Sequence, residues 1–157
     1  MNQENTGMQA IEGLVSIEET LSKIYRLLAE RFPADRELWS RMAQEETTHA
    51  KWVRDLSSRV EDGSLSLDED RFGVEGIQLF LEYAEDKFQE AKAEKLPFLH
   101  ALDMALDLES SLLERKLYQV FKADSESMEQ ALEDMEQQIR EHTERIRGAL
   151  AHEKGRA

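Results

Sequence analysis

The chain has 157 residues, of which 40% are hydrophobic and 34% charged, with seven Gly and two Pro; this is typical of one domain of long solvated helices. Its formal net charge of −14 argues against nucleic acid or an anionic membrane surface as a partner, because both reward a positive patch. The absence of Cys excludes disulfides, iron–sulfur clusters and Cys-based zinc sites, so any metal must be held by carboxylates and imidazoles.

The spacing of apolar residues predicts two helices in the first part of the chain. The first covers about residues 8–31 and ends before Pro33, and the second runs from Asp35, which suits an N-cap, to about residue 60. Residues 61–73, "EDGSLSLDEDRFG", combine Gly and Ser with a dense acidic run and lack the spacing of a calcium-binding loop. We expect this segment to be a solvated loop.

Three more helices are predicted in the second part of the chain. They cover about residues 74–94, residues 98–121, and a last segment from Ser125 or Ser127 to about residue 152. The turn before the second helix and the turn before the last one are short. Short turns join antiparallel neighbours, so the chain is predicted to contain two helical hairpins.

The predicted fold is therefore all-α, with residues 1–157 forming a single domain. The two hairpins, residues 8–60 and 98–152, would form a four-helix bundle. A long crossover, residues 61–97, would join them and carry the extra helix, which is one of the known topologies of four-helix bundles.

Acidic and histidine residues interrupt the apolar face of each of the four bundle helices. In the second helix, Glu46 and His49 occupy core positions between Met42 and Val53. The complete set of interruptions is Glu18 in the first helix, Glu46 and His49 in the second, Glu109 in the fourth and His142 in the fifth. We expect these side chains to meet at one level of the bundle.

Three carboxylates in one core are unfavourable unless protons, hydrogen bonds or a cation compensate their charge. Lys and Arg are absent from the central core positions, so a divalent cation is the expected counter-charge. Carboxylates together with neutral imidazoles suit iron, manganese or zinc. The alternative for Glu46 and His49 is a pair of core polar residues that are hydrogen-bonded to each other or to Tyr25.

The bundle stretches "SIEETLSKIYRLLAERFP", "LWSRMAQEETTHAKWV", "ALDMALDLESSLLERKLY" and "LEDMEQQIREHTERI" are similar to the rubrerythrin branch of the ferritin-like superfamily. In that family, two helices each supply a Glu and two others each supply a Glu-x-x-His to a di-iron site. Tyr25, seven residues after Glu18, also matches the first helix of the family. The resemblance implies that the metal ligands are Glu18, Glu46, His49, Glu109 and His142.

The chain departs from the family pattern in two respects. When Met42–His49 is aligned with Met135–His142, Ile139 stands where the second Glu-x-x-His needs its Glu. Glu141 is rotated about 200° round the helix from that position, and Glu136 is one turn away. No rubredoxin-like segment is present, because such a segment needs four Cys.

Two hypotheses about function follow. The first is a non-haem iron oxidoreductase, of the peroxidase or ferroxidase type, that acts on peroxide or oxygen and receives electrons from a separate donor. One metal would be held by Glu18, Glu46 and His49, and a weaker second one by Glu109 and His142, which share Glu46. The second hypothesis is a degenerate bundle that binds a structural metal or none and serves as an interaction or oligomerisation module.

The remaining expectations concern location and the other conspicuous side chains. The N-terminal stretch "MNQENTGMQAIEGL" has no basic patch and no apolar run of signal-peptide length, so we expect a cytoplasmic protein. A homodimer is expected by analogy with other bundles. His100 and His152 are predicted to lie at the surface, and Trp39, Trp52 and Tyr118 are predicted to pack in the core or at helix edges.

Overall fold

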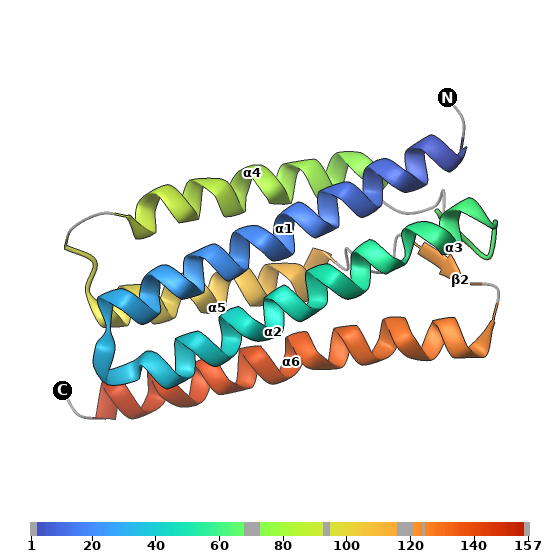
Figure 1. The fold of residues 1–157 in the computed structure, drawn as a ribbon. Helices are drawn as coiled ribbons and strands as arrows, with labels where there is room; N and C mark the ends of the chain where they lie inside the picture. Colours follow the sequence, from blue (N-terminus) through green and yellow to red (C-terminus); the bar gives the residue numbers. More distant parts are fainter. Residues whose placement is uncertain (1–2, 68–72, 93–94, 116–120, 124, 156–157) are drawn as a thin grey trace.

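The computed structural model describes residues 3–67, 73–92, 95–115, 121–123 and 125–155. It is all-α, as predicted, and its long helices lie side by side in one bundle (Figure 1). The helices are α1 (Gln3–Arg31), α2 (Arg36–Asp55), α3 (Ser57–Glu61), α4 (Gly73–Ala91), α5 (Phe98–Arg115) and α6 (Glu126–Gly155). None of the described helices is both long enough and apolar enough to cross a membrane.

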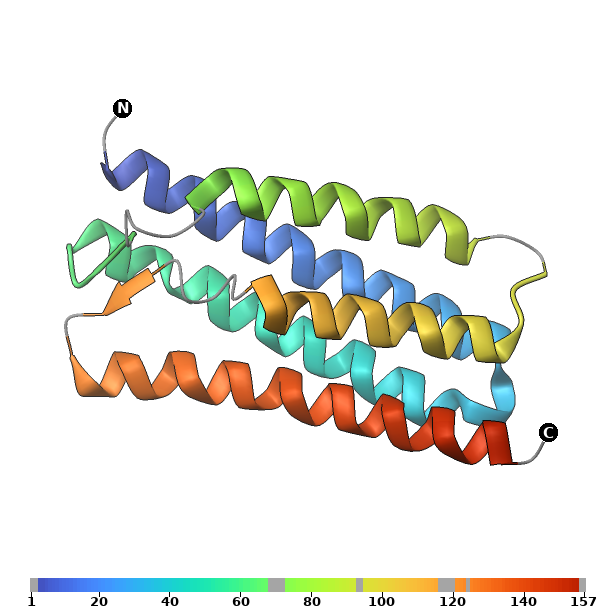
Figure 2. The same ribbon diagram turned by 180° about the vertical axis from the view of Figure 1, so that it is seen from behind.

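The long helices form two antiparallel hairpins. Helix α1 packs along α2, and α5 packs along α6 (Figures 1 and 2). Helix α4, on the connection between the hairpins, packs against α1 on the side away from α6. The predicted order of a hairpin, a crossover with its own helix and a second hairpin is therefore observed.

A short β-ribbon at one end of the bundle was not predicted. Strand β1 (Leu65–Leu67) pairs antiparallel with β2 (Phe121–Ala123), so the connection after α3 meets the connection before α6. The prediction of a loop over residues 61–73 is wrong for β1. The prediction that the fourth helix reaches Phe121 is wrong as well, since Phe121 belongs to β2. Residues 116–120, with Tyr118, lie outside the described part.

The predicted second helix is interrupted at Leu56. The Leu56 N–H bonds to the Val53 carbonyl at 3.0 Å, a tighter turn than that of an α-helix. The Ser58 hydroxyl donates to the Asp55 carbonyl, at 3.1 Å. Ser side chains compete with helical hydrogen bonding in this way, and α3 continues the chain after the break.

The helix starts differ from the prediction in two places and agree in one. Asp35 precedes α2 but makes no side-chain capping bond, because residues 33–35 form a 3₁₀ turn instead. Helix α1 begins at Gln3, before the predicted residue 8. Ser125 does cap α6, since its hydroxyl accepts a hydrogen bond from the Met128 N–H at 3.2 Å.

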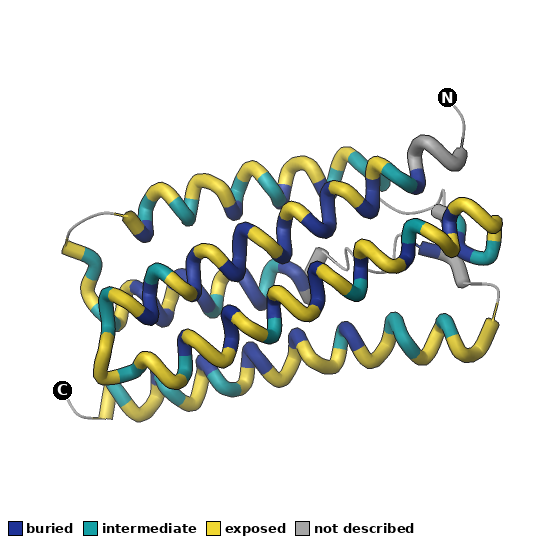
Figure 3. The backbone as a smooth tube through the Cα atoms, viewed as in Figure 1, coloured by how far each residue is buried: buried dark blue, intermediate teal, exposed yellow. Residues whose placement is uncertain are grey.

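The core lies between the inward faces of the helices. Figure 3 shows buried residues recurring along the facing sides of the long helices and exposed residues on their outer sides. At one end of the core, Trp39 stacks on Tyr25 with ring centroids 5.9 Å apart and meets Phe98 edge-on. The predicted apolar faces of α1 and α2 are buried throughout, which fixes the side of each helix that faces the centre.

Gly13 tests the contact between α1 and α4. A Cβ at Gly13 would lie 2.5 Å from Cγ2 of Ile77, whereas a Cβ at Gly148 in α6 would meet nothing within 4 Å. We expect Gly13→Ala to lower the free energy of unfolding by about 1–2 kcal/mol, because α4 must shift. Gly148→Ala should raise it by about 0.5–1 kcal/mol through helix propensity. Urea unfolding measures both, and equal stabilisation by the two substitutions would contradict this packing.

Candidate metal centre

The structure brings all five predicted site residues together in the middle of the bundle. Each of them is at most 2% exposed. They come from four different helices: Glu18 from α1, Glu46 and His49 from α2, Glu109 from α5, and His142 from α6. They form two groups of three that share Glu46, and each group could hold a metal ion, since it offers three ligand atoms within 4.8 Å of one another.

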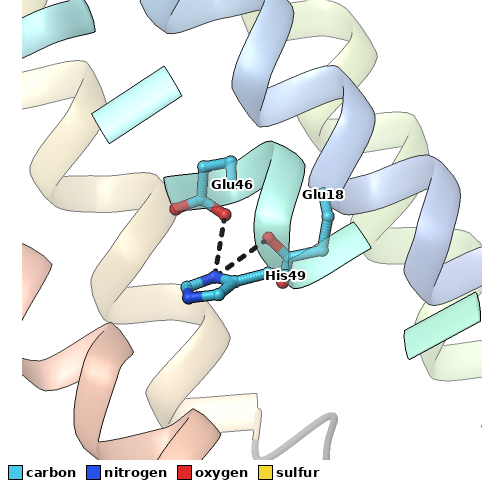
Figure 4. A group of neighbouring side chains, drawn as sticks. All are labelled: Glu18, Glu46 and His49. Carbon is cyan, nitrogen blue, oxygen red and sulfur yellow. Dashed lines mark ion pairs between the residues drawn. The ribbon is translucent and has the colours of Figure 1, made fainter. Parts of the chain in front are cut away.

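The first group consists of Glu18, Glu46 and His49. Nδ1 of His49 lies 3.7 Å from Oε2 of Glu18 and 3.5 Å from Oε2 of Glu46. Figure 4 shows this nitrogen facing both carboxylates, while the second ring nitrogen points away from them. Two oxygens and one nitrogen therefore converge on a single point from two helices.

The second group consists of Glu46, Glu109 and His142. Nδ1 of His142 lies 2.8 Å from Oε1 of Glu46 and 3.4 Å from Oε1 of Glu109. Glu46 thus turns one carboxylate oxygen toward each histidine. The two imidazole rings are stacked, with centroids 5.6 Å apart, so the groups are direct neighbours.

The outer nitrogen of each histidine is held by a residue of the opposite helix. Nε2 of His49 is hydrogen-bonded to Oε1 of Gln138 in α6, and Nε2 of His142 to Oε2 of Glu45 in α2, the latter at 2.7 Å. An amide oxygen and a carboxylate only accept, so both Nε2 atoms carry the proton. In a neutral imidazole, Nδ1 then carries the lone pair, and in both groups Nδ1 faces the carboxylates.

Glu45 differs from Gln138 in charge and in surroundings. Its Oε1 lies 3.1 Å from Nε of Arg41 and 3.1 Å from Nη1 of Arg145. Burial raises the pKa of Glu45, but the hydrogen bond with His142 and the charge of Arg145 bring it below its ordinary value. His142 is therefore backed by an anion and His49 by a neutral amide.

Several atoms that face the centre make no hydrogen bond with the described residues although they are buried. They are Oε1 of Glu46, Nδ1 of His49 and Oε2 of Glu109. Oε1 of Glu46 is close to His142, but not in the direction of a hydrogen bond. The other oxygen of Glu109 accepts from the Tyr25 hydroxyl at 2.7 Å. Buried polar atoms without a hydrogen-bond partner are unusual, and a bound cation would give these atoms a partner.

Without a metal, protons neutralise much of this charge. Burial alone would lower the pKa of His49, but Glu18 and Glu46 raise it to about 11, and Glu109 and Glu46 raise that of His142 to about 11. Burial, and then Glu46, raise the pKa of Glu18 to about 8. The metal-free site therefore holds two imidazolium cations beside its carboxyl groups at neutral pH.

No acidic side chain among the described residues takes the place of the Glu that the family pattern has at position 139. Ile139 is buried in α6 beside His142, at the position where the family pattern has Glu. Glu141 is exposed, and Glu136 pairs with Arg140 at 3.1 Å, so neither replaces it. His100 and His152 are exposed, as predicted, and His100 bonds to Glu90 at the surface.

Sequence reasoning missed Glu45 and Gln138, although the internal repeat contains the signal. In the alignment of Met42–His49 with Met135–His142, Glu45 and Gln138 occupy the same position. In the structure, each of them contacts the histidine on the other helix. The repeat therefore extends to the residues that orient the histidines.

No model of a known protein family, no curated protein and no solved structure matches the chain. The ferritin-like resemblance thus stays an expectation from the sequence. The support for a function comes from the site itself.

The stability of the metal-free protein should depend on pH with a definite sign. The folded state holds extra protons between about pH 6.5 and 11 on both histidines, and between about 4.5 and 8 on Glu18. Stability falls with rising pH wherever the folded state binds more protons. The melting temperature of chelator-treated protein should therefore decrease from pH 6.5 to 9.5.

The control for this measurement is His100→Gln, which removes an exposed histidine outside the site. Its melting temperature should fall over the same pH range as that of the parent. A parent protein whose melting temperature is constant or rises would show that the buried histidines are not protonated in the folded state.

Proposed function

We propose that the chain is a ferritin-like, rubrerythrin-like metalloprotein, in which α1, α2, α5 and α6 form the four-helix bundle. Its activity would be that of a non-haem iron oxidoreductase acting on peroxide or oxygen. Electrons would come from a separate donor, since the chain has no Cys for a rubredoxin-like relay.

One observation carries this proposal. Both buried histidines donate Nε2–H to a residue of the opposite helix, so that both Nδ1 atoms face carboxylate oxygens. This is the usual arrangement of metal-bound histidine, in which a hydrogen bond to the outer nitrogen fixes the tautomer and the ring orientation. In the metal-free protein both rings are protonated and each Nδ1–H faces these oxygens; a bound metal ion would take the place of those two protons.

The residues have different roles in this proposal. Glu18, Glu46 and His49 would hold one ion, while Glu109 and His142, together with Glu46, would hold a second ion more weakly because Ile139 supplies no ligand. When bound, iron would supply redox chemistry at open coordination positions. The hydroxyl of Tyr25 donates a hydrogen bond to Glu109 and orients this carboxylate.

The second candidate is a degenerate bundle with a structural metal or none. The observation that favours it is Ile139, whose buried aliphatic side chain stands where the family pattern has Glu. Imidazolium and carboxyl groups can neutralise each other in the metal-free core, so under this candidate the bundle would need no ion. Metal content separates the two candidates.

Protein supplied with iron during purification should contain one to two ions per chain and show a ferric absorption that disappears on reduction. Saturating metal at about 100 times Kd should stabilise the fold by about 2.7 kcal/mol. For a chain of this size, this corresponds to a rise of about 5–10 °C in melting temperature.

Glu46→Gln should abolish this stabilisation, because it removes a ligand from both groups. His49→Gln should weaken metal binding by more than the roughly 10–100-fold that is lost when only the hydrogen-bond partner of a ligand is removed. The matched control is His100→Gln, which removes an exposed histidine and should change nothing. A parent protein that is isolated without metal, and that no added metal stabilises, would rule out the oxidoreductase.

A further inference from the structure

The five site residues are almost fully buried, so an ion needs a path to them. A hollow of about 230 Å³ lies between α2 and α6 and reaches His49 of the first group. Thr48 and Trp52 of α2 and Asp134 and Gln138 of α6 are among the residues that line it. The hollow therefore connects the surface with the edge of a buried imidazole.

The side chains in this hollow suit a cation. Asp134 is exposed and brings a carboxylate, and the Thr48 hydroxyl and the Gln138 amide add oxygen atoms. Hard divalent ions that still carry water are bound by such oxygens. An anionic group at the entrance of a hollow also raises the local concentration of cations.

A polar connection between the site and the surface through Glu45 is unfavourable for a cation. Glu45 is in contact with His142 on one side and with Arg41 and Arg145 on the other. An approaching ion would meet two guanidinium groups there. The two histidines thus have unlike surroundings toward the solvent, although the repeat relates Glu45 to Gln138.

We propose that the α2–α6 hollow is the entry route for a divalent metal ion, with Asp134 attracting the ion and Gln138 controlling access to His49. This inference rests on the proposed function. Gln138 is itself exposed while its amide is bonded to Nε2 of the buried ring, so rotation of this side chain opens the Nε2 edge of His49, from which the ion would pass the ring to reach Nδ1 and the carboxylates. Asp134 and Gln138 act on the rate of loading, and the metal ligands determine the affinity.

The test measures binding and release of Co²⁺ by stopped-flow absorption with the metal-free protein. Asp134→Asn should slow both uptake and release roughly threefold to tenfold at low ionic strength and leave Kd unchanged, because Asp134 acts on the path and not on the bound ion. The difference should disappear at high salt, where charges at the surface are screened. Glu141→Gln is the matched control, since Glu141 lines a different hollow on α6 that contains none of the five site residues.

Gln138→Ala shows whether Gln138 controls the access of the ion to His49 or only holds the His49 ring in its orientation. Loss of support alone weakens the affinity and accelerates release, with the uptake rate unchanged. Control of access requires that uptake accelerates as well. Gln138→Glu keeps an acceptor for His49 and adds a negative charge, so its uptake should also be faster than that of the parent.

The outcomes distinguish this inference from the proposed function. If the parent binds no Co²⁺, the proposed metal site itself is wrong. If the parent binds Co²⁺ but the uptake rates of Asp134→Asn and Gln138→Ala equal that of the parent, the site stands and the route is wrong.

Discussion

The structure depends on how a helical core accommodates three carboxyl groups and two imidazoles at one level. Buried charges are tolerated only when partners neutralise them, and here each histidine faces two acids. Protons can provide the balance in the metal-free state, and a cation would replace them. Binding of a metal would therefore release protons from the site. Because the groups come from α1, α2, α5 and α6, this balance also joins the two hairpins.

The residues of the site could be predicted because a helix has a fixed period. Once Met42 and Val53 are assigned to the core, Glu46 and His49 must face it too, and the structure places them there. The β1–β2 ribbon could not be predicted, since two three-residue strands from distant connections carry no periodicity. The break at Leu56 could not be predicted either, because the apolar pattern continues across it. The break depends on local hydrogen bonds, which this pattern does not reveal.

The residues around the ligands were harder to predict than the ligands. Gln138 is exposed and Glu45 half-buried, so neither stands out on an apolar face. Their role becomes clear only in the structure, where each side chain is hydrogen-bonded to Nε2 of a histidine on the opposite helix. Their difference in charge makes the two groups unequal, as does Ile139. The carboxylate of Glu45 is hydrogen-bonded to His142, and the neutral amide of Gln138 is hydrogen-bonded to His49.

The most direct test of a metal site shared by these helices is anomalous X-ray scattering at the iron edge from crystals grown with ferrous iron. We expect a strong peak within bonding distance of Nδ1 of His49 and the carboxylates of Glu18 and Glu46. Any second, weaker peak should lie beside Nδ1 of His142 and Glu109. Iron found only at surface carboxylates, with the histidines still facing the acids directly, would contradict a metal site shared by these helices.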